Sequence, residues 1–387
     1  MSLIVIVCCN PAESRSARIG NKSATGAARA RSLSLKNEDG TRRMNEPISP
    51  YVLTNQNSPA FWLIDNLWMP LAGSFLTNGN FCFIEQVCGT GIGGPPTHSH
   101  PSDEGLYILE GHCTFHAGGE TVQAGPGTLV SVPRFVEHSF TVDAPHSRLL
   151  NFYSPGGFEM LLMSLATPAA ERKPPTPGST PMPPRWMVEE CSREFGQIPG
   201  GSLPFADPPT KENMITKPSA VNPIKPYGIN VKDAPAYWSQ GILWTILATA
   251  EQTGGSYSLM QELCPKDSGP PPHTHEQDEV IYVMEGELTM ILGAEKVRAK
   301  AGALAYIPAR SVHSFRIDSQ EARLLNFYLP GGFERVITEF GIPAKSRVIP
   351  PPDLKSPATP EQMKALFQRV GMNGVALPDS LRDGGKN

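Results

Sequence analysis

The sequence lacks the features that mark a membrane protein or a secreted disulfide scaffold. None of its apolar runs approaches the ~20 residues that a membrane-spanning helix needs. Its seven cysteines are an odd number scattered from Cys8 to Cys264, which favours a reducing compartment over a disulfide framework. A formal net charge of −4 offers no basic surface to nucleic acid or to an anionic membrane. We therefore expect neither partner and a cytoplasmic location.

The first 43 residues also lack the pattern of a folded domain. The apolar run from Leu3 to Cys9 is short and no basic segment precedes it, which argues against a secretory signal. Residues 1–43 contain eight basic and three acidic residues, so an organellar transit peptide stays an alternative. Met44 is an alternative start. We expect residues 1–43 to be a disordered tail or to lie outside the natural protein.

The chain contains nine histidines, and none of them precedes His98.

A length of 387 residues exceeds that of one ordinary domain, so we expect at least two domains. Forty prolines and 36 glycines without a collagen-like period favour many short strands joined by tight turns.

An internal repeat organises the chain. The segment His98–Gly111 recurs as His273–Gly286, at an offset of 175 residues. Upstream of these segments the offset becomes 176, as Trp68 and Trp244 show. A period of this length indicates a duplicated whole domain and not a solenoid.

Both copies are predicted to consist mainly of β structure, because short apolar or alternating runs are punctuated by Gly, Pro and Asp. We expect strands at 106–109, 128–132, 149–153, 281–284, 303–307 and 324–328. Helices are expected at 158–165, 185–195, 333–340 and 360–370. Many closely spaced strands favour a barrel or jelly roll. The predicted fold is all-β, with two tandem barrels, short flanking helices, and domains at 44–208 and 209–387.

Six of the nine histidines occupy equivalent positions in the two copies, and a glutamate accompanies each set at the same spacing. The sets are His98, His100, Glu104 and His138 in the first copy and His273, His275, Glu279 and His313 in the second. Histidines that merely pack would be expected to drift after duplication, so the shared set indicates two metal sites. Residues two apart on a strand face the same side, which directs His98 and His100 into one barrel.

Three neutral imidazoles and one carboxylate suit a divalent transition metal. Such donors are compatible with Mn, Fe, Co, Ni, Cu or Zn and leave coordination positions for a substrate. The donors alone do not choose among these metals. We expect one ion per domain, with Fe, Mn, Ni, Co or Cu as the candidates.

This spacing resembles the paired motifs of the cupin superfamily. The first motif has the form His-x-His-x3-Glu-x6-Gly, and the second contains Gly127, Pro133 and His138 in one copy and Gly302, Pro308 and His313 in the other. The resemblance implies a cupin barrel, a double-stranded β-helix of the jelly-roll type, in each half. Phe135 and Arg310 stand where the family usually has Gly, and Val142 and Ile317 where it usually has Asn.

Within that superfamily the chain resembles the bicupin quercetin 2,3-dioxygenases, also called flavonol dioxygenases. Two complete motif sets and the repeated segment Pro-Gly-Gly-Phe-Glu, at 155–159 and 330–334, carry the resemblance. It implies a metal-dependent dioxygenase that opens a flavonol or related aromatic ring with O2. It also implies that Glu104 and Glu279 act both as ligands and as general bases. A small aromatic substrate and O2 are the expected partners, and a homodimer stays open.

Two other functions stay open. An oxalate decarboxylase-like bicupin that acts on a small carboxylic acid needs a cationic clamp, for which Arg134 and Arg310 are candidates. The third hypothesis is a non-catalytic ligand-binding bicupin. Retention of all eight predicted metal ligands favours an enzyme over this hypothesis.

Other residues are assigned weaker roles. The aromatic residues after the motifs are expected either to line an apolar pocket or to form barrel core: Phe140, Phe152, Tyr153, Phe315, Phe327 and Tyr328. The histidines without a repeat partner, His112, His116 and His146, are expected at the surface. Asp103 and Asp278 are expected in turns, and support of the neighbouring glutamate ligands is the alternative.

Overall fold

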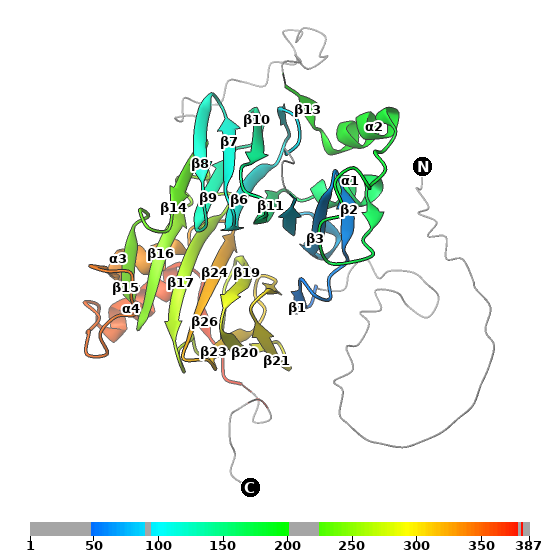
Figure 1. Cartoon of the computed structure of the whole chain (residues 1–387). Helices are drawn as coiled ribbons and strands as arrows, with labels where there is room; N and C mark the ends of the chain where they lie inside the picture. Colours follow the sequence, from blue (N-terminus) through cyan, green and yellow to red (C-terminus); the bar gives the residue numbers. More distant parts are fainter. Residues whose placement is uncertain (1–47, 90–93, 201–223, 378–380, 382–387) are drawn as a thin grey trace, which may run out of the picture. The chain divides into compact units, whose positions relative to one another are not determined.

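The computed structural model describes residues 48–89, 94–200, 224–377 and 381. The expectation of a disordered tail at 1–43 lies outside these residues, as does most of the segment between the two halves. Within the described residues, the all-β prediction with short flanking helices is confirmed (Figure 1).

The first half contains most of its strands before its two helices. Its strands are β1 Tyr51–Thr54, β2 Phe61–Leu63, β3 Asn66–Ala72, β4 Cys82–Cys88, β5 His98–Ser99, β6 Asp103–Glu110, β7 Cys113–Ala117, β8 Glu120–Ala124, β9 Thr128–Val132, β10 His138–Val142, β11 Ser147–Ser154, β12 Thr167–Pro168 and β13 Ile198–Pro199. Its helices are α1 Phe158–Leu165 and α2 Arg185–Phe195, with a short 3-10 helix η1 Ser74–Leu76.

The second half repeats this order. Its strands are β14 Tyr227–Asn230, β15 Ala236–Ser239, β16 Ile242–Ala248, β17 Ser258–Pro265, β18 His273–Thr274, β19 Asp278–Glu285, β20 Glu287–Leu292, β21 Glu295–Lys300, β22 Ala303–Ile307, β23 His313–Ile317, β24 Glu321–Leu329, β25 Ile342–Pro343 and β26 Asn373–Gly374. Its helices are α3 Glu334–Phe340 and α4 Pro360–Arg369.

Each half pairs an eight-stranded sheet with a five-stranded sheet. The first half has the strand orders β12-β2-β3-β4-β11-β6-β9-β14 and β13-β5-β10-β7-β8. The second half has β1-β22-β19-β24-β17-β16-β15-β25 and β21-β20-β23-β18-β26. Apolar side chains from both sheets form the interior of each barrel, as two facing sheets require.

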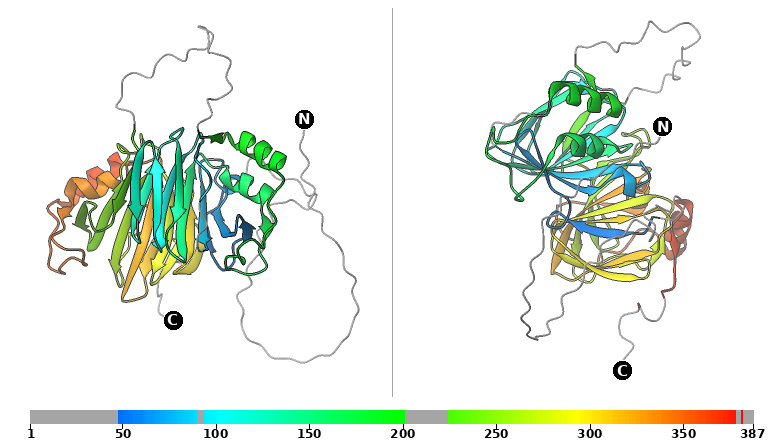
Figure 2. Two further views of the ribbon diagram at one scale, coloured as in Figure 1. Left: turned by 45° about the horizontal axis from the view of Figure 1, so that its top comes forward. Right: turned by 90° about the vertical axis from the view of Figure 1, so that its right-hand side faces the viewer.

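The two halves exchange their corresponding first strands. β1 comes from the first half, yet it pairs with β22, where Tyr51 lies opposite Tyr306. Conversely, β14 pairs with β9, where Tyr227 lies opposite Ser131. In the right-hand view of Figure 2 the blue β1 lies among the yellow strands of the second half. The domain boundaries expected at 44–208 and 209–387 stay a prediction, and each segment contributes one strand to the sheet of the other.

A shared apolar cluster joins the two eight-stranded sheets within the unit that spans residues 48–387. The rings of Phe152 and Phe327, equivalent residues of the two halves, lie 5.3 Å apart between centroids. Polar contacts cross the same boundary, since the Tyr282 hydroxyl donates to Glu85 Oε2 at 3.0 Å. Burial of this cluster makes the two halves one packed body.

The helices follow the barrels as predicted. α1 and α2 have the predicted bounds, and α3 and α4 each differ from the prediction by one residue. The side chain of Thr359 caps α4 in a capping box with Gln362, and Pro360 occupies the first turn. Among the described residues, no helix combines the length and the apolar character that crossing a membrane demands.

Two non-glycine residues in left-handed conformation mark the turn before the last histidine of each set. Phe135 has φ 63° and Arg310 has φ 65°. Their backbone N–H groups donate to the carbonyls of His100 and His275 at 2.8 and 2.7 Å. This conformation explains why glycine suits the position in cupins, since a side chain there costs about 1–2 kcal/mol.

We predict that Phe135→Gly raises the thermal midpoint by a few degrees. Phe135 is exposed, so its loss removes little packing, and relief of the left-handed strain exceeds the ~0.4–1 kcal/mol that glycine adds to the entropy of the unfolded chain. Scanning calorimetry of the two proteins measures the shift. Phe135→Val is the control and lowers the midpoint, because a β-branched residue tolerates positive φ least. A lower midpoint for Phe135→Gly would contradict this account.

Candidate metal centres

The two sheets of each barrel contribute different residues to the predicted site. In the first half, His98 lies on β5 and His138 on β10, and these residues face each other as a cross-strand pair of the five-stranded sheet. Glu104 lies on β6 in the eight-stranded sheet. His100 follows β5 directly. The structure therefore brings all four predicted residues together between the sheets.

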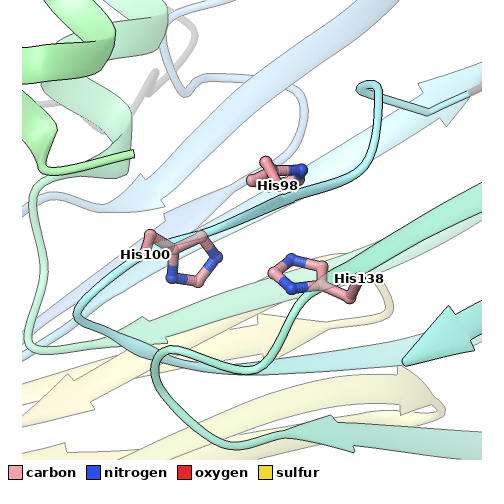
Figure 3. A group of neighbouring side chains, drawn as sticks. All are labelled: His98, His100 and His138. Atoms are coloured by element: carbon pink, nitrogen blue, oxygen red, sulfur yellow. The ribbon is translucent and has the colours of Figure 1, made fainter. Parts of the chain in front are cut away.

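The three imidazoles of the first half converge on one small region (Figure 3). Each offers one nitrogen, and the three nitrogens of His98, His100 and His138 lie within 4.8 Å of one another. All three residues are buried. The nearest pair of rings, His98 and His138, has centroids 4.4 Å apart. This clustering of buried imidazoles is the arrangement that a single metal ion requires.

Backbone carbonyls set the tautomer of every histidine in the first set. Nδ1 of His98 lies 2.8 Å from the carbonyl of Pro96, that of His100 3.0 Å from Ser102, and that of His138 2.8 Å from Val136. Because a carbonyl can only accept, each Nδ1 must carry the hydrogen. Nε2 of a neutral ring is then left with a lone pair directed into the site, as in metal-binding histidines.

A carboxylate completes the set. Oε2 of Glu104 lies 3.1 Å from Nε2 of His100 and 2.9 Å from Nε2 of His138. Nε2 of His138 is buried and has no partner in hydrogen-bond geometry. Lone pairs of imidazole and carboxylate that face each other at these distances repel unless a cation, either a proton or a metal ion, lies between them. The residues present therefore fit a bound cation.

The second half reproduces this geometry. Nδ1 atoms of His273, His275 and His313 lie 2.8–3.0 Å from backbone carbonyls. Oε2 of Glu279 lies 3.1 Å from Nε2 of His275 and 2.9 Å from that of His313. Again a buried Nε2, that of His313, has no partner in hydrogen-bond geometry. Two sites with the same donor set are thus built from the two copies of the repeat.

The electrostatics of the sites keep one histidine of each set neutral. Burial, together with the neighbouring His138, lowers the pKa of His98 to about 4. Burial and His313 lower the pKa of His273 to about 4 in the same way. A neutral imidazole is the form that binds a metal. Burial opposes ionisation of Glu104, but the neighbouring imidazoles of His100 and His138 hold its pKa well below the usual range.

Asp103 and Asp278 position the turn before the last histidine. The backbone N–H of Arg134 donates to Asp103 Oδ1 at 2.9 Å, and that of Ala309 donates to Asp278 Oδ1 at 2.8 Å. These aspartates are the first residues of β6 and β19, one residue before the glutamate of each site, so the prediction that they lie in turns is wrong. They couple the glutamate strand to the turn that leads to the last histidine.

A short strand after the helices covers the His-x-His strand in each half. β13 pairs with β5, placing Pro199 opposite His98, and β26 pairs with β18, placing Gly374 opposite His273. The structural repeat therefore continues, at the offset of 175, past the last segment in which the residues of the two halves match. This part of the repeat consists of backbone pairing, which does not require particular side chains.

A cavity of about 120 Å³ adjoins the second site. His273, Glu279 and His313 lie in its wall. The remaining wall is mostly apolar and aromatic and includes Ile242, Trp244, Phe315, Tyr328, Phe333, Val336, Ile337, Phe367 and Met372. Its other residues are Gln240, Glu262, Gly269, Pro270 and Asn326, so no lysine or arginine of the described part of the chain lies in the wall.

Several weaker expectations are settled by this arrangement. Phe315 and Tyr328 line the cavity, whereas Phe152 and Phe327 belong to the core between the halves. The three unrepeated histidines are exposed, as predicted. Arg134 and Arg310 form ion pairs with Asp103 and Glu276 and do not line the cavity of the second site.

Sequence reasoning missed three residues of this cavity. These are Trp244, Glu262 and Phe367. Continuing the offset of 176 through β4 and β17 aligns Gln86 with Glu262, and that comparison would have identified the acidic residue. Nothing in the sequence indicates that α4 reaches the cavity, because its contact with the barrel depends on the path of the connecting chain.

Known proteins are similar to this chain over most of its length. Residues 89–149 and 259–328 match the family model of the cupin domain. The chain is 24% identical to quercetin 2,3-dioxygenase of Bacillus subtilis over 289 residues, which are 73% of this chain and 80% of that protein. It is 27% identical to an uncharacterized protein of Streptomyces coelicolor over 107 residues, which are 28% of this chain and 97% of that protein.

Solved structures of oxalate decarboxylase resemble this chain in fold. The Bacillus subtilis enzyme, in a structure concerned with its Mn(II) centres, superposes with a TM-score of 0.51 at 15% identity, over 74% of this chain and 79% of that chain. A structure concerned with the substrate-binding mode and reaction specificity of oxalate decarboxylase gives 0.50 at 15% identity over the same shares. At this identity the likeness shows the fold alone.

We predict that the purified protein binds about two transition-metal ions per chain, since both donor sets are complete. His98→Ala and His273→Ala are each expected to lower the metal content by about one ion, because loss of one imidazole opens the donor set. Elemental analysis against protein concentration measures both effects.

His146→Ala is the matched control, since His146 is an exposed histidine outside both sites, and the metal content should not change. An unaltered metal content in His98→Ala or His273→Ala would contradict the ligand assignment for that half.

Proposed function

Because the chain is a bicupin of the cupin superfamily that resembles quercetin 2,3-dioxygenases, we propose that it is a metal-dependent dioxygenase. It opens a hydroxylated aromatic or flavonol ring with O2 and binds one divalent transition metal in each half. The observation that carries this proposal is the cavity beside the second site, whose wall is mostly apolar, includes five Trp, Tyr or Phe rings and, among the residues that the structure describes, has no lysine or arginine. Such a wall suits a planar uncharged ring better than a small dianion.

The metal ligands in this proposal are the eight predicted residues. His98, His100, Glu104 and His138 would hold the ion of the first half, and His273, His275, Glu279 and His313 that of the second. A bound transition metal would supply Lewis acidity and the chemistry of O2. Fe, Mn, Ni, Co and Cu stay the candidates.

The chain's own residues bind and orient the ring. Trp244, Phe315 and Phe333 line the cavity, where aromatic side chains can stack against a planar substrate and exclude water. By resemblance, Glu104 and Glu279 are also the candidate bases for the substrate hydroxyl. Both of their Oε2 atoms lie against two imidazoles, so this role requires one contact to weaken.

The size of the cavity bears on the substrate. A volume of about 120 Å³ accommodates a single ring, whereas pockets for larger ligands measure roughly 300 Å³ or more. Phe367 at the end of α4 and Met372 after it form part of the wall. A complete flavonol therefore requires displacement of this segment, and a single-ring hydroxylated compound does not.

An oxalate decarboxylase-like activity on a small carboxylic acid is the second candidate, and its support is the likeness in fold. That reaction needs a cation for the carboxylates. Arg134 and Arg310 are engaged with carboxylates, and their side chains are 46% and 76% exposed. Arg310, the candidate of the second half, does not line the cavity of that half, and this supports our preference for the dioxygenase.

We predict O2-dependent release of carbon monoxide when the protein, loaded separately with each candidate metal, is incubated with quercetin or with a single-ring 3-hydroxy-4-pyranone. Parallel aerobic and anaerobic assays measure the gas and the loss of substrate absorbance. Oxalate is the comparison substrate.

Formate or CO2 from oxalate, with no O2-dependent loss of either ring compound, would overturn the dioxygenase proposal in favour of the second candidate. The double variant with His98→Ala and His273→Ala is the control for activity that does not depend on the two sites.

A further inference from the structure

The two sites differ in one acidic residue on a neighbouring strand. All eight predicted ligands match between the halves, but Glu262 on β17 stands where the first half has Gln86 on β4. Gln86 Oε1 accepts a hydrogen bond from Asn151 Nδ2 at 2.7 Å, and Glu262 Oε1 accepts one from Asn326 Nδ2 at 2.8 Å. An amide therefore satisfies the same pairing, so packing alone does not require an acid at this position.

Glu262 lies in the wall of the substrate cavity. It is completely buried, on the same face of β17 as Met260 and Cys264, which belong to the barrel interior. The cavity wall that contains it also contains His273, Glu279 and His313. Burial of an ionisable carboxyl is unfavourable unless it is paired, and the hydrogen bonds to this one come from an amide and a thiol, with no lysine or arginine among the described residues of the wall.

The two oxygens of Glu262 have unequal partners. Oε1 receives the amide of Asn326, whereas the hydrogen bond to Oε2 comes from the thiol of Cys264 at 3.5 Å, a weak donor. Oε2 can therefore take a stronger donor. Asn326 Nδ2 also lies 3.1 Å from the hydroxyl of Tyr328, so Asn326 links Glu262 to the ring that packs on His275.

The electrostatic environment supports exchange of a proton at neutral pH. Burial raises the pKa of Glu262 to about 7; the hydrogen bond from Asn326 opposes this shift, and the negative charge of Glu279 adds to it. The titratable groups that face it are Glu279, Tyr328 and Cys264, and the imidazoles of His273 and His313 line the same cavity. A base with a pKa near the working pH is the most effective one.

We infer that Glu262 accepts the proton of the substrate's acidic hydroxyl in the second half, and that this half is therefore the faster of the two sites. The inference rests on the proposed function. In this step the O–H bond of the substrate breaks, its electron pair stays on the substrate oxygen, and the proton forms a bond with a carboxylate oxygen of Glu262. Glu279 then need not leave its two imidazoles. Gln86 cannot accept a proton at the matching position of the first half.

Counting protons without turnover tests the inference. The protein is loaded with Zn²⁺, which is redox-inert, and titrated under nitrogen with a 3-hydroxy-4-pyranone, a single ring with a hydroxyl beside a carbonyl. A pH indicator in weakly buffered solution at pH 8 reports the protons released on binding. Glu262→Gln is expected to release about one more proton per chain than the parent protein, because the carboxylate no longer retains it.

Gln86→Glu is the reciprocal variant and is expected to release about one proton fewer per chain. Metal content should stay the same in both variants, since neither residue is a predicted ligand. In the aerobic assay, Glu262→Gln is expected to lower kcat by about 100-fold or more, the usual contribution of a general base.

Equal proton release by the parent protein and Glu262→Gln, with the probe bound by both, would overturn the inference. So would failure of the parent protein to bind the probe. If no ring compound is consumed with O2, the proposed function fails, whereas the proton count still decides whether Glu262 is the acceptor.

Discussion

The structure depends on the repulsion between imidazole and carboxylate lone pairs that are buried close together in each half. In each half, imidazole nitrogens that carry lone pairs and a carboxylate oxygen lie about 3 Å apart inside a barrel. The groups are buried, so solvent screens them little and a cation between them removes the repulsion. The surrounding architecture holds this arrangement in place. The Nδ1 atoms are fixed by backbone carbonyls, and the aspartates that precede the glutamates hold the turns before the last histidines.

Each metal site takes its residues from two sheets, so the strands must keep a fixed register for the site to form. Cross-strand pairing of His98 with His138, and of His273 with His313, sets the register on one side. A slip of one residue would turn an imidazole away from the site. The exchange of β1 and β14 and the shared aromatic core between the halves restrain the other side. The duplication is therefore a single packed body, and it differs in this from two barrels joined by a linker.

Within this nearly symmetric body the chemistry is not symmetric. The ligand positions are the same in both halves, but the wall of the second cavity contains Glu262, where the first half has an amide. A buried carboxyl without a cationic partner is costly, and an amide makes the same hydrogen bond. The acid is thus best explained by what it does to a bound molecule.

The sequence by itself determined the repeat, the all-β class, the helices after each barrel, and the residues that the structure gathers into two clusters. It could do so because strand periodicity, helix caps and histidine spacing are local properties. Only the tertiary structure decided which sheet each strand joins, that β1 and β14 are exchanged, and that Phe367 lines the cavity beside the second site. These features depend on contacts between residues far apart in the chain, which no local pattern encodes. Glu262 was determined partly by each. The repeat in the sequence aligns it with Gln86, but only folding places it in the same cavity wall as Glu279.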